Sequence, residues 1–214
     1  MTDTFRHKGM RKQMVNELIS LGIKDERVLQ AMHEVPRHLF FEAAFLEHAY
    51  ENKAFPIAAG QTISQPYTVA FQSELLRVEK GEKILEIGTG SGYQAAVLYA
   101  MGAKVYSIER QRALYIRSKE VLQNLGYRVK TYYGDGYKGK PAFAPFDKII
   151  VTCGAPFIPE ELVKQLKIGG RMVIPVGNKI QQMKLLIKTS ETDYELKAFG
   201  DFKFVPMLEK KADE

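Results

Sequence analysis

The sequence has one cysteine, Cys153, and no tryptophan among its 214 residues. A single cysteine cannot form a disulfide within the chain, which excludes a disulfide-stabilised secreted scaffold and suits a reducing compartment. No apolar run approaches the roughly 18 residues that a membrane-spanning helix needs, and the N-terminal MTDTFRHKGMRKQMV lacks the apolar core of a secretory signal. These absences predict a soluble, cytoplasmic protein with no membrane partner.

Clustered positive charge is also absent. The formal net charge is +6, from 31 Lys and Arg against 25 Asp and Glu, yet no run of basic residues resembles a nucleic-acid arm. Scattered charge of this kind is typical of a solvated surface, so we expect no nucleic-acid partner. The histidines show no paired metal-binding spacing, so we expect no metal site. They are His7, His33, His38 and His48.

The N-terminal part of the sequence has helical patterns. Apolar residues recur at helical spacing over residues 10–21, and Gly22 ends the pattern. Asp25 is placed to cap a second helix, which ends before Pro36. A further helix is expected over residues 68–76. A chain of this length can bury one sizeable core, so a second full domain is not expected. We therefore expect residues 1–78 to form a helical cap and a substrate loop over the carboxyl edge of a sheet.

Strands and helices alternate from residue 79. The predicted strands are 83–88, 104–109, 128–135 and 146–153, and the predicted helices are 93–101, 112–125 and a short one over 159–166 that Gly169 and Gly170 end. Three consecutive strands then follow with no room for helices between them. This order predicts an α/β fold with a mostly parallel sheet and an antiparallel edge over residues 79–208, followed by a solvated tail over 209–214.

The clearest chemical motif is EIGTGSG, from Glu86 to Gly92. A loop between a strand and a helix must turn sharply and let a ligand approach its backbone, and residues without a Cβ allow both. The glycines alone also fit a tight turn without a ligand. Glu109 ends the next strand, about 20 residues further on, where an acid can bind ribose hydroxyls. Together the loop and the acid favour an adenosine-type cofactor.

The glycine spacing distinguishes between two cofactors. It is G-x-G-x-G, whereas dinucleotide sites have G-x-G-x-x-G and hold a pyrophosphate at a helix N-terminus. S-adenosylmethionine has no phosphate. Its ammonium group suits Glu86, although this acid can also simply bond backbone amides. Its adenine suits Asp135 and Gly136, although Asp-Gly also forms ordinary turns. The set predicts a methyltransferase that uses S-adenosylmethionine and releases S-adenosylhomocysteine.

The chain resembles the protein-L-isoaspartate (D-aspartate) O-methyltransferase family. The matching segments are RVLQAMHEVPRHLF, GQTISQP, ILEIGTGSGYQAAVL, GDG, FDKIIVTCGAP, LKIGGRMVIPVG and FVPM, in family order. The resemblance implies a single Rossmann-like, S-adenosylmethionine-dependent methyltransferase domain without a metal. It also implies methyl transfer to the free α-carboxylate of L-isoaspartyl residues in damaged proteins and peptides. The ester then forms a succinimide, which returns in part to normal aspartate. A monomer is the default for this family.

The resemblance also implies roles for individual residues. Ser64 stands at the family's active-site serine, and Val205 lies in the segment that contacts the substrate backbone. The substrate-binding residues are Thr62, Ile63, Ser64, Gln65 and Val205. The cofactor-binding residues are Gln65, Tyr67, Glu86, Gly88, Thr89, Gly90, Ser91, Gly92, Glu109, Arg110, Asp135 and Gly136. The sequence departs from the family at Cys153 and Gly154, where many members have alanines, and in its short tail after Pro206.

The loop that carries Ser64 has no charged residue. A carboxylate is already a nucleophile at neutral pH, because its pKa is near 4. Attack on a sulfonium methyl therefore needs no general base, only alignment and partial desolvation. We expect Ser64 to orient the acceptor carboxylate; the alternative is that it caps a turn or the following helix. Cys153 follows a buried strand and is expected to be structural.

Two other functions stay open at this point. One is an RNA or small-molecule methyltransferase on the same fold, against which stand the lack of a dense basic patch and of an N-P-P-Y type motif. The other is a cofactor-binding protein that has lost catalysis, against which stand the intact loop, Glu109 and Ser64.

Overall fold

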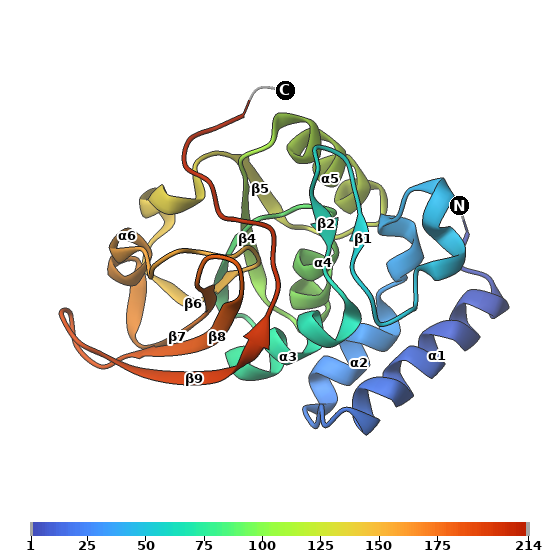
Figure 1. Ribbon diagram of the computed structural model, residues 1–214, viewed down its shortest axis with the longest axis horizontal. Helices are drawn as coiled ribbons and strands as arrows, with labels where there is room; N and C mark the ends of the chain where they lie inside the picture. Colours follow the sequence, from blue (N-terminus) through green and yellow to red (C-terminus); the bar gives the residue numbers. More distant parts are fainter. Residues whose placement is uncertain (1, 213–214) are drawn as a thin grey trace.

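A seven-stranded sheet forms the centre of the computed structural model, which describes residues 2–212 (Figure 1). Its strand order is β5-β4-β3-β6-β7-β8-β9. The strands are β3 (Lys83–Ile87), β4 (Lys104–Glu109), β5 (Lys130–Tyr133), β6 (Phe146–Val151), β7 (Leu166–Val176), β8 (Gln181–Lys188) and β9 (Tyr194–Phe202). All pairs from β5 to β7 are parallel, and β8 and β9 add antiparallel pairs. The predicted α/β fold with an antiparallel edge is confirmed.

Helices cover both faces of the sheet. They are α1 (Phe5–Ser20), α2 (Glu26–Glu34), α3 (Pro66–Leu76), α4 (Tyr93–Ala100), α5 (Arg112–Asn124) and α6 (Glu160–Lys164). Successive residues of a strand face opposite sides, so Ile84 joins the core cluster that includes side chains of α1 to α5, while Leu85 joins the cluster that includes α6. Within residues 2–212, every helix is too short or too polar to span a bilayer.

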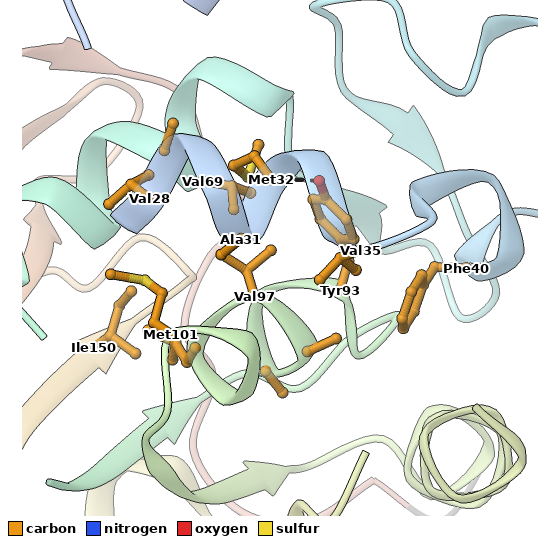
Figure 2. Close-up of a cluster of buried hydrophobic side chains, with 14 of the residues drawn as sticks. Val28, Ala31, Met32, Val35, Phe40, Val69, Tyr93, Val97, Met101 and Ile150 are labelled. Atoms are coloured by element: carbon orange, nitrogen blue, oxygen red, sulfur yellow. Dashed lines mark hydrogen bonds between the residues drawn. The ribbon is translucent and has the colours of Figure 1, made fainter. Parts of the chain in front are cut away.

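Helices α1 and α2 form a second layer outside α3 and α4 (Figures 1 and 2). In Figure 2, Ala31 and Met32 of α2 face Val97 and Tyr93 of α4, and all four side chains are buried. Asp25 caps α2 as predicted, because its carboxylate accepts a hydrogen bond from the amide of Arg27 at 2.9 Å. The prediction placed residues 1–78 over the carboxyl edge of the sheet. Of the described part of this segment, the residues that line the pocket at that edge come from the hairpin of β1 (Phe55–Pro56) and β2 (Thr62–Ile63), from the loop after it, and from Val69 of α3.

Several predicted boundaries differ from the structure, and two of them have a clear physical reason. Helix α3 begins at Pro66, two residues before the predicted start, because proline fits the first helical turn, where no amide donor is needed. Gly169 and Gly170 do not end α6; they lie inside β7, which begins at Leu166. A Cβ on Gly170 would come within 2.7 Å of the carbonyl oxygen of Lys167 and 2.9 Å of that of Asp147. This glycine therefore permits a close backbone approach, a role that the sequence pattern does not distinguish from helix termination.

The C-terminal tail is bound to the sheet edge rather than only solvated. Its side chains are mostly exposed, as expected, but its backbone pairs with the segment after β4. The amide of Ala212 donates to the carbonyl of Arg110 at 2.8 Å, and the amide of Arg112 donates to the carbonyl of Ala212 at 3.1 Å. The last two residues of the predicted tail lie outside the described residues.

A buried acid occupies the central strand. Glu86 of β3 is fully buried, and one carboxyl oxygen accepts a short hydrogen bond from the Ser107 hydroxyl of β4. The other carboxyl oxygen has no hydrogen-bond partner among the described residues. Burial, opposed by Ser107 and supported by the nearby charge of Glu109, raises the pKa of Glu86 to about 8. Glu86 is therefore mainly protonated at neutral pH.

This raised pKa predicts a pH-dependent effect of Glu86→Gln. The pKa of an unperturbed glutamate is 4.5, so between this value and about 8 the folded chain holds a proton that the unfolded chain has lost. The parent protein therefore loses stability as the pH rises through this window. Relative to the parent, the free energy of unfolding of the Glu86→Gln variant should rise by at least about 2 kcal/mol from pH 5 to pH 8. Urea titrations at several pH values measure it.

Glu120→Gln, on the exposed side of α5, controls for the loss of a carboxylate. A stability difference between Glu86→Gln and the parent that does not change with pH would contradict a protonated Glu86.

Candidate active site

The main pocket lies where the strand order reverses. After β3 the chain adds β4 and β5 on one side, and then crosses to β6 on the other side of β3. Loops that leave neighbouring strands in opposite directions open a crevice at the carboxyl ends of the strands. The pocket there has an empty volume of about 750 Å³, which includes solvent at its mouth. Of the predicted residues it is lined by Thr62, Ile63, Ser64, Gly88, Thr89, Gly90, Ser91, Glu109, Arg110, Gly136 and Val205.

The glycine loop needs its first glycine for two reasons. Gly88 has a φ of +97°, a conformation that residues with a Cβ rarely adopt. A Cβ at this position would also lie 2.6 Å from the hydroxyl oxygen of Thr152, in the segment after β6. That hydroxyl donates to the carbonyl of Gly88 at 2.7 Å. The loop is thus held against the neighbouring strand end while its backbone faces the pocket.

Glu109 links the glycine loop to the end of β4. Its two carboxylate oxygens accept hydrogen bonds from the amides of Gly90 and Gln111, each at 2.8 Å. Burial raises the pKa of Glu109, although these amide donors oppose the rise. A carboxylate offers about four acceptor sites, so two amide donors leave capacity for hydroxyl groups of a ligand.

Ser64 lies between the main pocket and a second depression, the aromatic groove. This groove is lined by Tyr67, Phe71, Phe202 and Phe204, with Gln65 among its other residues, and it shares Thr62, Ser64, Thr152 and Val205 with the main pocket. The N-cap residue of α3 is Gln65, and no side chain caps this helix. The alternative role of Ser64 as a helix cap is therefore excluded. Its hydroxyl makes no hydrogen bond within residues 2–212 and is available to a ligand.

Three predicted cofactor residues do not line either depression: Glu86, Gly92 and Asp135. Glu86 faces Ser107 in the sheet interior, and Gly92 is the N-cap residue of α4. The carboxylate of Asp135 accepts from the amide of Tyr137 at 3.0 Å and from that of Lys210, in the tail, at 3.1 Å. The cofactor contacts predicted for Glu86, Gly92 and Asp135 therefore stay predictions.

Several residues of the main pocket were not predicted from the sequence. Thr152 and the segment from Pro206 to Leu208 line it, as does Tyr93 at the start of α4. Thr152 is the first residue after the carboxyl end of β6, a position that predicts a pocket residue. It was not predicted because the predicted strand extended to Cys153. The C-terminal segment has no such signal, because only the folded chain brings it to the pocket.

Cys153 and Gly154, at which the sequence departs from the family, have different roles in the structure. Cys153 lines the main pocket, but burial raises the pKa of its thiol to about 12, so it is neither a thiolate nor a nucleophile. A Cβ on Gly154 would come within 2.8 Å of the Gln181 side chain. The amide oxygen of Gln181 accepts from the backbone of Phe204 at 2.8 Å. Gly154 thus leaves room for the residue that holds the start of the C-terminal pocket segment.

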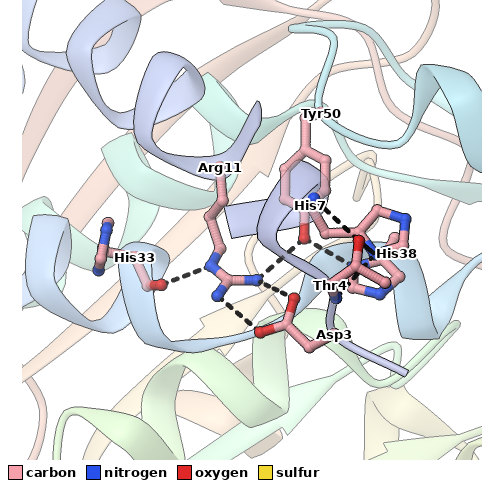
Figure 3. Close-up of polar contacts among 7 residues, drawn as sticks. All are labelled: Asp3, Thr4, His7, Arg11, His33, His38 and Tyr50. Atoms are coloured by element: carbon pink, nitrogen blue, oxygen red, sulfur yellow. Dashed lines mark hydrogen bonds and ion pairs between the residues drawn. The ribbon is translucent and has the colours of Figure 1, made fainter. Parts of the chain in front are cut away.

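A polar cluster brings Asp3, His7 and His38 together, with ligand atoms within 4.8 Å of one another (Figure 3). The Arg11 guanidinium donates to both carboxylate oxygens of Asp3, at 3.0 and 2.9 Å. The two imidazole rings are stacked, with centroids 3.8 Å apart and planes 20° from parallel. Nitrogen lone pairs in nearly parallel planes do not converge on one ion at the roughly 2 Å that a metal requires. This geometry suits a hydrogen-bonded network rather than a metal centre.

Comparison with known proteins places the chain in a family. A family model described as protein-L-isoaspartate(D-aspartate) O-methyltransferase matches residues 9–212. The protein-L-isoaspartate O-methyltransferase of Christiangramia forsetii is 61% identical to this chain, and that of Flavobacterium johnsoniae is 59% identical. Each comparison covers 99% of this chain and 100% of the relative.

Solved structures agree with these relatives. A protein-L-isoaspartate O-methyltransferase structure superposes with a TM-score of 0.84 and 31% identity, over 92% of this chain and 65% of its own. A structure from Plasmodium falciparum, in complex with S-adenosyl-L-homocysteine, has the same fold, with a TM-score of 0.81 and 24% identity over 92% of this chain and 98% of its own. With a family model over nearly all of its length and relatives of about 60% identity, the chain belongs to the protein-L-isoaspartate(D-aspartate) O-methyltransferase family.

Proposed function

We propose that this chain is a protein repair methyltransferase. It transfers a methyl group from S-adenosylmethionine to the free α-carboxylate of L-isoaspartyl residues in damaged proteins and peptides. The methyl ester then closes to a succinimide, which returns in part to normal aspartate. One observation carries the proposal beyond family membership: Ser64 lies at the junction of two depressions, one for each reactant.

The main pocket fits S-adenosylmethionine. Gly88 lets backbone approach the ligand, and Glu109 has acceptor capacity for ribose hydroxyls. When bound, this cofactor supplies a methyl group on a positively charged sulfur, and S-adenosylhomocysteine is the product. The glycine and hydroxyl residues of the loop bind the methionine part of the cofactor. They need no phosphate-binding site, because S-adenosylmethionine has no phosphate.

The residues around Ser64 align the acceptor and exclude water. An isoaspartyl α-carboxylate is ionised at neutral pH, so the chain does not have to remove a proton from it. The Ser64 hydroxyl donates one hydrogen bond, which orients the carboxylate without neutralising it as a fixed ammonium would. From Thr62 to Gln65 no side chain is charged, and Ile63 is buried. The reactants bring both charges of the reaction, and the loop brings them together in a partly dry site.

The aromatic groove is the proposed position of the substrate peptide. The ring centroids of Phe71 and Phe202 are 5.4 Å apart, and those of Tyr67 and Phe71 are 5.7 Å apart. These rings are half-buried, so they offer apolar surface to residues beside the isoaspartate. Gln65 and Tyr67 lie in this groove rather than in the main pocket, and we therefore assign them to the substrate.

The proposal includes a cytoplasmic monomer without a nucleic-acid partner. The single cysteine supports the cytoplasmic location, and the scattered basic residues support the lack of a nucleic-acid partner. The monomer is the default for a chain of this size and family.

The function itself is tested with a pair of peptides that differ only in isoaspartate or aspartate at one position. With radiolabelled S-adenosylmethionine, we expect base-labile label in the isoaspartyl peptide and none in the aspartyl peptide, because the Ser64 site accepts a backbone-like α-carboxylate. Bulk RNA is a third substrate. Label in RNA alone would support the RNA methyltransferase. Cofactor binding by calorimetry without label in any substrate would identify a binding protein that has lost catalysis.

The role of Ser64 is tested by Ser64→Ala. Loss of a hydrogen bond to a charged group costs about 1.5–3 kcal/mol, so turnover of the isoaspartyl peptide should fall about tenfold to a hundredfold. The affinity for S-adenosylhomocysteine should stay within about twofold, because the assigned contact is to the acceptor. Ser20→Ala, at the distant end of α1, is the control. Equal losses of turnover and cofactor affinity would show that the serine is structural.

Glu109→Gln should weaken cofactor binding. Glutamine keeps the shape of the side chain but offers a single acceptor oxygen in place of the two that bond Gly90 and Gln111. We expect the dissociation constant for S-adenosylhomocysteine to rise about tenfold or more, measured by calorimetry. Glu120→Gln again serves as the matched control. Unchanged affinity would remove Glu109 from the ribose site.

A further inference from the structure

Arg37 lies fully buried beneath the loop that carries Ser64. It is the first residue of the short 3-10 helix Arg37–Phe40. Its Nε donates to the carbonyl oxygen of Ala49 at 2.8 Å, and its Nη2 donates to the carbonyl oxygen of Ser64 at 2.8 Å. A side chain from the helical layer is therefore bonded directly to the backbone of the residue at the junction of the two depressions.

The same guanidinium contacts the helix that follows the glycine loop. Its central carbon lies 4.7 Å from the ring centroid of Tyr93 and 5.2 Å from that of Phe41. Tyr93 begins α4 and lines the main pocket. One planar group thus joins the Ser64 loop to the wall of the main pocket, through one hydrogen bond to the Ser64 backbone and a contact with the face of the Tyr93 ring.

Packing alone does not account for this arginine. Arg37 forms no ion pair within residues 2–212, and its Nη1 has no hydrogen-bond partner there. Burial lowers the pKa of Arg37 to about 10, so it remains charged at neutral pH. Burying an unpaired charge costs several kcal/mol, and an apolar side chain of similar volume would fill the space without that cost. What the guanidinium adds is a rigid fork of donors that an apolar side chain lacks.

We propose that Arg37 is a positioning residue for methyl transfer: it holds the Ser64 backbone relative to Tyr93 and so sets the distance between the acceptor carboxylate and the main pocket. This inference rests on the proposed function. Arg37 touches neither reactant, since it lines neither the main pocket nor the aromatic groove. Transfer requires the reacting atoms in line at about 3–3.5 Å, so a small shift of the loop lowers turnover.

Arg11 offers a matched control in the same helical layer. Its side chain is also buried and also donates to a backbone carbonyl, that of His33, as well as to Asp3 and Tyr50 (Figure 3). It makes no hydrogen bond to the loop over residues 62–65. Loss of Arg11 therefore removes a buried arginine from the layer without removing the bond to Ser64.

The experiment compares Arg37→Met, Arg37→Lys and Arg11→Met at a temperature at which thermal melts show all three folded. We expect Arg37→Met to lower kcat for the isoaspartyl peptide at least about thirtyfold, with affinity for S-adenosylhomocysteine within about threefold. Arg37→Lys, which keeps the charge but not the fork, should lose about tenfold. Arg11→Met should lower Tm comparably, with kcat within about threefold. Hydrogen exchange over residues 61–67 should accelerate in Arg37→Met and not in Arg11→Met.

Two results would overturn the proposal. Parental kcat in Arg37→Met would mean that the arginine only fills space, and an equal loss in Arg11→Met would mean that any damage to the layer has this effect. If Arg37→Met does not fold, Arg37→Lys decides: parental kcat and parental exchange in that variant reject a positioning role. Failure of the parent protein to methylate the peptide would reject the proposed function instead, while the exchange comparison would still test whether Arg37 holds the loop.

Discussion

The reversal of strand order at β3 is the constraint on which the rest of the structure depends. After β5 the chain crosses to the other side of β3 to form β6, so the loops after β3 and β6 separate and leave a crevice between them. Gly88 can approach Thr152 across this crevice because it has no Cβ, and Glu109 ties the glycine loop to the next strand. Any ligand in the crevice meets a surface that three strand ends already hold in place.

The N-terminal helical layer completes this crevice without supplying charge. Helices α1 and α2 pack on α3 and α4, and the layer supports the hairpin that brings Ser64 over the carboxyl edge. The buried cation of Arg37 stays below the loop, where it bonds a carbonyl rather than the reacting groups. Positive charge is thus used to shape the loop, while the loop itself, from Thr62 to Gln65, has no charged side chain. This division suits a reaction between an anion and a cation.

Much of the fold follows from local patterns. The strand and helix order, the antiparallel edge and the glycine loop were predicted correctly, because side-chain periods of 2 and 3.6 residues show in short windows of sequence. The direction of Glu86 did not follow, since β3 is apolar on both faces and its pattern does not say which neighbour an acid would meet. Gly169 and Gly170 were misassigned because glycine also occurs inside a strand, where Gly170 permits a close backbone approach and Gly169 has a positive φ.

By itself, the sequence determined the fold class, the cofactor loop and the uncharged segment around Ser64, since each is written in consecutive residues. Only the tertiary structure decided that Arg37 reaches Ser64, that Thr152 supports Gly88, and that the tail binds beside β4. These contacts join residues that are distant in sequence. They depend on strand order and on how the layers pack, and no single stretch of sequence encodes either one.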